Sequence, residues 1–192
     1  VVLLGCHLDS WDLGTGALDD GAGCAIVIEA ARRIGLRRQS PLRTVRVVLF
    51  ANEENGLGGA KAYAEAHRDE LARHVLAGES DFGDGRVQRI RSKVAPDRLP
   101  LFAAIGRLLA PLGVEIGDND AGGGADLGPL APARVPIVAL GQDGSRYFDY
   151  HHTANDTLDR IDPEALRQNV AAYAVFAYLI ADNDWVLTPP PA

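Results

Sequence analysis

Methionine is missing from this sequence of 192 residues, and cysteine occurs only twice, as Cys6 and Cys24. Two cysteines are too few for a disulfide framework, and their spacing is not that of a C-x-x-C motif. We interpret both as small buried residues, Cys6 at the end of an apolar run and Cys24 on a helix. The redox compartment of the protein is therefore not determined by its sequence.

Basic residues and long hydrophobic runs are also scarce. The chain has 19 Lys and Arg against 26 Asp and Glu, a formal net charge of -7. Nucleic acids and anionic membranes are bound through basic patches, so the acidic excess argues against both partners. No apolar run reaches the roughly 18 residues that a membrane-spanning helix needs. A small peptide remains compatible as a partner, and the oligomeric state stays open.

The first apolar run, Val1–Leu4, has no methionine and no charged leader in front of it. We therefore expect the sequence to begin inside a domain, with a signal peptide or early strands upstream. Residues 1–187 are predicted to form this partial domain. The Pro-rich residues 188–192 are predicted to be a disordered tail.

Short runs rich in β-branched residues alternate with longer segments of helical character. Strands are predicted at 1–4, 43–50, 75–77, 87–90 and 136–140, with 87–90 at the sheet edge. Helices are predicted at 22–36, 58–74, 99–112 and 163–181, the last with Asp162 as its N-cap and Pro163 in its first turn. This alternation predicts an α/β three-layer sandwich with a mostly parallel, mixed sheet flanked by helices.

Five segments rich in acids and histidines follow these strands or lie close to them. They are GCHLDSWD (5–12), LDDGAG (18–23), NEENG (52–56), GESD (78–81) and HHTANDT (151–157). Each motif by itself could have a purely structural role; Asp19, for example, could be the N-cap of a helix. Sites in open α/β sheets form beyond the carboxyl ends of the strands, so we expect the five segments to converge there.

Carboxylates that converge in this way repel one another unless cations lie between them. Two histidines with several Asp and Glu form a nitrogen and oxygen ligand set that suits zinc. Two metals that share a carboxylate would explain why more than three ligands are available. Asp9 lies two residues after His7 and can point the same way, so we expect its carboxylate to orient the imidazole.

Taken in order, the five motifs resemble those of metallopeptidase clan H, family 28, the zinc aminopeptidases and carboxypeptidase Q-like exopeptidases. The resemblance covers nearly the whole chain. It implies a phosphorylase/hydrolase-like zinc exopeptidase fold, two Zn²⁺ per chain, a small peptide substrate and a secreted or periplasmic location. Members of the family normally carry further sequence before the first His motif.

The resemblance also implies individual roles. Glu53 is implied to be the general base, with Asp9 beside it in the catalytic machinery. The implied metal ligands are His7, Asp19, Glu54, Asp81 and His152, with Asp19 as the bridge. His152 rather than His151 fits the family pattern His-Thr-x-x-Asp-Thr.

Three further residues are candidate substrate contacts. Asp126, in GADLGPL, resembles a family motif in which the preceding residue is often Ser. Arg146 and Tyr147 lie in the loop before the last histidine, where they could bind a substrate terminus or donate to an oxyanion.

Two alternatives remain open. The first is a single-zinc transferase similar to glutaminyl cyclase on the same scaffold, although the presence of both His7 and His152 favours two metals. The second is a receptor-like, non-catalytic module, which would be expected to lack several ligands. The sequence does not distinguish an aminopeptidase, a carboxypeptidase and a dipeptidase.

Overall fold

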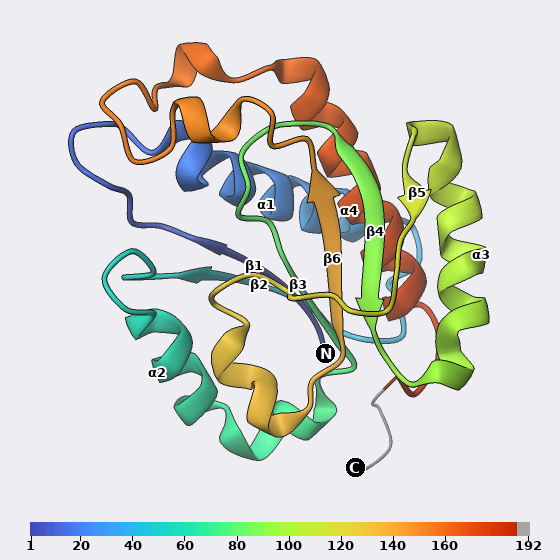
Figure 1. Cartoon of the computed structure of the whole chain (residues 1–192). Helices are drawn as coiled ribbons and strands as arrows, with labels where there is room; N and C mark the ends of the chain where they lie inside the picture. Colours follow the sequence, from blue (N-terminus) through green and yellow to red (C-terminus); the bar gives the residue numbers. More distant parts are fainter. Residues whose placement is uncertain (188–192) are drawn as a thin grey trace.

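The structure is a computed structural model that describes residues 1–187. A mixed six-stranded sheet runs through its middle in the order β2-β1-β3-β6-β4-β5 (Figure 1). Strands β1, β2, β3 and β6 are mutually parallel, and β4 and β5 run the opposite way. The strands are β1 (Val2–His7), β2 (Val45–Phe50), β3 (Leu76–Glu79), β4 (Val87–Lys93), β5 (Glu115–Ile116) and β6 (Ile137–Gln142).

Helices cover both faces of this sheet. The helices are α1 (Ala22–Gly35), α2 (Gly58–Ala66), α3 (Leu99–Leu109) and α4 (Pro163–Ala181). Helices α1 and α4 lie side by side on one face, and α2 lies on the other (Figure 1). The predicted three-layer sandwich with a mostly parallel sheet is therefore confirmed.

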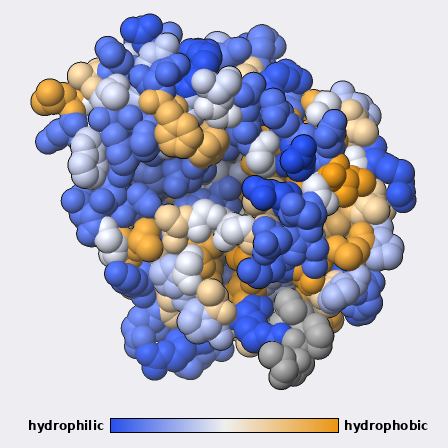
Figure 2. Space-filling view, in the orientation of Figure 1, coloured by the Kyte–Doolittle hydropathy of each residue, from blue (hydrophilic) through white to orange (hydrophobic). Residues whose placement is uncertain are grey.

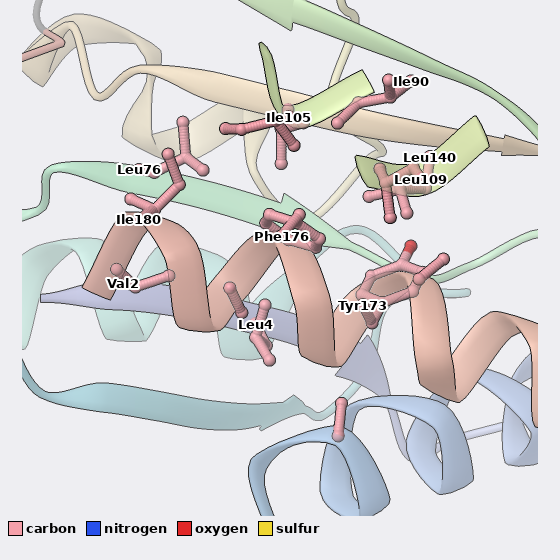
Figure 3. Packing of buried hydrophobic residues seen from close by; sticks show 14 of the residues in the cluster. Val2, Leu4, Leu76, Ile90, Ile105, Leu109, Leu140, Tyr173, Phe176 and Ile180 are labelled. Atoms are coloured by element: carbon pink, nitrogen blue, oxygen red, sulfur yellow. The ribbon is translucent and has the colours of Figure 1, made fainter. Parts of the chain in front are cut away.

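Strand β1 shows how the sequence builds the two cores. Successive side chains of a strand point to opposite faces, so Val2, Leu4 and Cys6 enter the core beneath α1 and α4. Leu3 enters the second core, on the α2 side. In Figure 3, Val2 and Leu4 lie beside Phe176 and Ile180 of α4. A strand buried on both faces reads as the continuous apolar run seen in the sequence.

Strand β4 is longer than predicted and does not lie at the edge, so that expectation is wrong. It pairs with β6 on one side and with β5 on the other. Strand β5 has only two residues, Glu115 and Ile116, and both are exposed. A segment of two residues is too short to show the period-2 pattern of a strand. The sequence therefore did not predict β5 as the edge strand.

Two predicted helices end earlier than expected. The segment 58–74 is divided into α2 and a 3₁₀ turn, Arg68–Arg73. Helix α3 ends at Leu109 and continues as a 3₁₀ turn over Ala110–Leu112. Pro111 has no N–H and its ring disturbs the preceding turn, which explains the second case. The predicted tail, 188–192, lies outside the described residues.

Hydrophobic residues on the visible face form separate patches on a mainly hydrophilic surface (Figure 2). Among residues 1–187, no helix combines the length and the apolar character needed to cross a bilayer.

The N-cap of α4 gives a test of the fold. The Asp162 carboxylate accepts hydrogen bonds from the backbone N–H groups of Glu164 (2.8 Å) and Ala165 (3.2 Å). We expect Asp162→Ala to lower the free energy of unfolding by about 1 kcal/mol, measured by urea denaturation. Asp162→Asn keeps a capping oxygen and should lose much less. Equal losses in both variants would show that the cap is not the cause.

Candidate metal centre

The predicted ligands come together at the carboxyl ends of the parallel strands. His7 is the last residue of β1, Glu53 and Glu54 follow β2, and Asp81 follows β3. His152 lies in the segment after β6. Because these four strands are parallel, their carboxyl ends meet at the same edge, which is where sites form in α/β sheets.

Asp19 lies between the two imidazoles. Its Oδ1 is 3.1 Å from Nε2 of His7, and its Oδ2 is 3.2 Å from Nε2 of His152. Its side chain is only 5% exposed. Each oxygen of this one carboxylate therefore faces a different histidine, which is the arrangement that a bridging ligand requires.

A second carboxylate accompanies each imidazole. Asp81 Oδ1 is 3.3 Å from His7 Nε2, and Glu54 Oε2 is 2.9 Å from His152 Nε2. The other Glu54 oxygen, Oε1, is buried and has no hydrogen-bond partner among residues 1–187. The ligand atoms thus form two groups, His7 with Asp81 and His152 with Glu54, on either side of Asp19.

The pKa values show how strongly the carboxylates interact. Burial by itself would lower the pKa of His7, but hydrogen bonds to Asp19 and Asp81 outweigh it and raise the pKa to about 12. Burial, and then the charge of Asp81, raises the pKa of Glu53 above its ordinary value. Burial and the charge of Asp19 raise the pKa of Glu54 in the same way. This much negative charge in a half-buried site favours bound cations.

Asp9 supports two of the ligand segments at once. Its backbone carbonyl oxygen is 2.9 Å from Nδ1 of His7, whereas its carboxylate is 3.8 Å from that atom. The carboxylate instead accepts hydrogen bonds from the backbone N–H groups of Glu53 (2.9 Å) and Glu54 (3.2 Å). Asp9 therefore contacts the imidazole at hydrogen-bond distance through its main-chain carbonyl, and not through its carboxylate as expected from the sequence. Its side chain instead holds the turn that carries Glu53 and Glu54.

The two acids of LDDGAG have different surroundings. Asp20 is buried, and its carboxylate accepts from the backbone N–H groups of His7 (3.1 Å) and Gly23 (3.0 Å). A Cβ at Gly23 would lie 2.0 Å from the carbonyl oxygen of Ser80, so only glycine fits there. Asp20 thus joins the end of β1 to the start of α1 and leaves Asp19 to face the histidines.

Asp156 was not singled out from the sequence as a site residue. It is buried, and its two carboxylate oxygens accept from the backbone N–H groups of Leu18 (2.6 Å) and Asp19 (3.1 Å). It therefore positions Asp19 from the segment that also carries His152. Its place in the HHTANDT motif was the available signal, but the residue it contacts lies 137 positions away.

Glu79 is a second residue that sequence reasoning missed. It is buried beside Asp126, and both oxygens of each carboxylate lack a hydrogen-bond partner among the described residues. Burial and the charges of Asp81 and Asp126 raise the pKa of Glu79 to about 9. Burial and the charge of Glu53 raise the pKa of Asp126 to about 7. Asp126 is thus placed in a buried acid pair, and its predicted contact with substrate stays a prediction.

The loop before His152 supplies an aromatic wall. Tyr147 is buried, and burial together with the nearby Asp19 charge raises the pKa of its phenol, so the hydroxyl keeps its proton. The guanidinium of Arg146 lies over the Tyr150 ring and donates to the carbonyl oxygen of Arg160 (3.3 Å). Arg146 and Tyr147 both line a pocket of about 210 Å³.

Backbone strain also marks this region. Asn52, just before the two glutamates, has φ 62°, and His152 has φ 60°. Residues other than glycine adopt this left-handed region at a cost, and such residues gather at functional sites. The Trp11 ring stacks on His152 at 4.8 Å between centroids, which holds the imidazole in place.

Comparison with known proteins identifies the family of this chain. A model of Peptidase family M28 matches residues 1–177. The chain belongs to peptidase family M28. The resemblance inferred from the five motifs is therefore confirmed.

Two relatives show how much of their own length the chain covers. A peptidase M28 precursor from Shewanella amazonensis SB2B, of known structure, is 54% identical, with a TM-score of 0.96; the match covers 100% of this chain and 43% of that one. Carboxypeptidase Q of Rattus norvegicus is 37% identical over 190 residues, which is 97% of this chain and 39% of that protein. The chain thus spans about two fifths of the length of this curated relative.

A glutaminyl cyclase from an Acidobacteriales bacterium has a TM-score of 0.70 at 20% identity, over 94% of this chain and 69% of its own. At that identity, the similarity shows a shared fold alone.

The contacts of Asp156 give a test of the site. We expect Asp156→Ala to weaken zinc binding by roughly 10- to 100-fold, because the turn that carries Asp19 loses both of its acceptors. Asp156→Asn keeps one carbonyl acceptor and should lose less. Isothermal titration with Zn²⁺ measures both, and circular dichroism checks that the variants fold. Wild-type affinity in Asp156→Ala would show that Asp19 does not depend on this contact.

Proposed function

We propose that this chain carries the catalytic site of a co-catalytic dizinc exopeptidase that removes residues from a terminus of small peptides or dipeptides. The observation that carries the proposal is the position of Asp19. One buried carboxylate faces both imidazoles, and each imidazole has its own second carboxylate, Asp81 or Glu54.

The donor set fits a pair of zinc ions. Imidazole nitrogens and carboxylate oxygens are ligands that Zn²⁺ prefers, and Asp19 would be shared between the two ions. The unpartnered Glu54 Oε1 and the raised pKa values of Glu53 and Glu54 are also what a site built for cations would show. When bound, two Zn²⁺ would polarise the scissile carbonyl and lower the pKa of a water from ~15.7 towards ~7.

Glu53 is suited to move the proton. Its carboxylate lies with His7 and Glu54 in a group of potential ligand atoms within 4.8 Å of one another. Burial raises its pKa, which brings a carboxylate closer to the working range of a general base. We assign Glu53 to take a proton from the attacking water and to deliver it to the leaving amine. Asp9 keeps Glu53 in position through the backbone N–H.

Substrate contacts are proposed in the loop before His152. The protonated Tyr147 hydroxyl is a hydrogen-bond donor beside the ligand cluster, and Arg146 supplies a positive charge at the same pocket. Leu18, Phe82 and Tyr150 add apolar surface to the lining. The pocket would therefore take one side chain or one charged terminus of a short peptide.

The alternatives make different predictions about metal content and turnover. A single-zinc cyclase would bind one ion tightly, whereas the two imidazoles on opposite sides of Asp19 favour two. A receptor-like module would bind peptides without cleaving them. Zinc- and cobalt-loaded protein should be assayed against aminoacyl amides, dipeptides and N-blocked peptides. The result would distinguish the exopeptidase from the cyclase and the receptor-like module, and would identify the terminus that is recognised.

The role of Glu53 is tested by Glu53→Gln. The amide has nearly the same shape but cannot accept the proton, so we expect hydrolysis to fall by at least ~10²-fold. Zinc content, measured by atomic absorption, should be unchanged. Turnover close to that of the wild type would remove Glu53 as the base.

The bridging role is tested by Asp19→Ala. Because both ions would lose a ligand, we expect both zinc-binding steps to weaken in a calorimetric titration. Asp81→Ala is the matched control, since Asp81 accompanies His7 alone and should weaken one step. Loss of a single step in Asp19→Ala would contradict the bridge.

A further inference from the structure

The two cysteines, 18 residues apart in sequence, meet beneath the ligand cluster. Cys6 is on the face of β1 that packs against α1, and Cys24 is in the first turn of α1. Their Sγ atoms are 2.8 Å apart. Both thiols are free, and neither has a role in the proposed hydrolysis. Cys6 is fully buried, whereas Cys24 is partly exposed.

We propose that Cys6 and Cys24 are a disulfide-forming pair, oxidised by low-molecular-weight disulfides. A disulfide bond is ~2.05 Å long, so the sulfurs need to approach by less than an ångström. The 192-residue sequence contains these two cysteines alone, so within this chain neither has a competing partner. The packing of β1 on α1 has therefore already brought the sulfurs together.

Cys24 is more exposed than Cys6, so we expect Cys24 to react first with the disulfide. The Cys24 thiolate attacks one sulfur of a disulfide RSSR, which forms a mixed disulfide and releases RS⁻. The Cys6 thiolate then attacks the sulfur of Cys24 in that mixed disulfide and releases the second RS⁻. The two protons of the protein thiols leave with the two RSH molecules. Two thiols are oxidised to one disulfide, and RSSR is reduced to two RSH.

This bond would tie together the two ends of the segment that carries ligands. Cys6 directly precedes His7, and the Cys24 thiol donates to the carbonyl oxygen of His7 at 3.0 Å. Cys24 also directly follows Gly23, whose N–H is held by Asp20. The loop between them, which includes Asp19, would be closed covalently at its base. We expect oxidation to stabilise this loop without any metal present.

The test uses the protein with a chelator present, so that it does not depend on zinc binding or on peptidase activity. After incubation with oxidised glutathione, we expect an intact mass lower by two hydrogens. No thiol should be alkylated after unfolding, and a non-reducing gel should show monomer. Dithiothreitol should restore both thiols. The melting temperature of the oxidised protein should be roughly 5–10 °C higher than that of the reduced protein.

Cys24→Ser is the matched control, because serine keeps a donor for the His7 carbonyl but cannot form the bond. It should show no increase in melting temperature on oxidation, and Cys6→Ala replaces it as the control if it does not fold. Two free thiols after oxidation would overturn the proposal. So would a mixed disulfide that persists, disulfide-linked dimers, or an oxidised protein with an unchanged melting temperature.

Discussion

Repulsion among carboxylates at the carboxyl ends of the parallel strands is the constraint on which this site depends. Asp19, Glu54 and Asp81 gather around two imidazoles, with Glu53 beside them. Without a cation, the positive charge of His7 has to offset several acids, as its raised pKa shows. The same crowding would favour the binding of divalent ions, because each ion would relieve a repulsion already present in the fold.

Other acids near the site hold the backbone of the segments that carry the predicted ligands. The carboxylates of Asp9, Asp20 and Asp156 each accept hydrogen bonds from two backbone N–H groups, and each bond fixes a segment next to a predicted ligand. Hydrogen bonds to an ionised carboxylate are stronger than those between neutral groups. The carboxylates of Asp19, Glu54 and Asp81 thus face the imidazoles. The carboxylates of Asp9, Asp20 and Asp156 instead hold the backbone of the turns beside them.

A buried tyrosine and an acid pair extend this support into the core. The hydroxyl of Tyr173, on α4, donates to the carbonyl oxygen of Glu79 at 2.7 Å and anchors the end of β3 just before Asp81. The side chain of Glu79 lies beside Asp126, and burial raises the pKa of both carboxyl groups. The chemistry at the edge of the sheet is thus connected to the packing of α4 beneath it.

The sequence by itself determined the sandwich class, most of the strands and helices, the Asp162 cap and the order of the five motifs. These features follow from local periodicity, from capping chemistry and from the rule that sites form at the carboxyl ends of parallel strands. Only the tertiary structure decided that β4 lies inside the sheet, that Asp19 faces both histidines, that Asp156 holds Asp19, and that Cys6 touches Cys24. Each of these depends on a contact between segments that the chain path brings together, and local sequence patterns carry no information about which distant partner a side chain will meet.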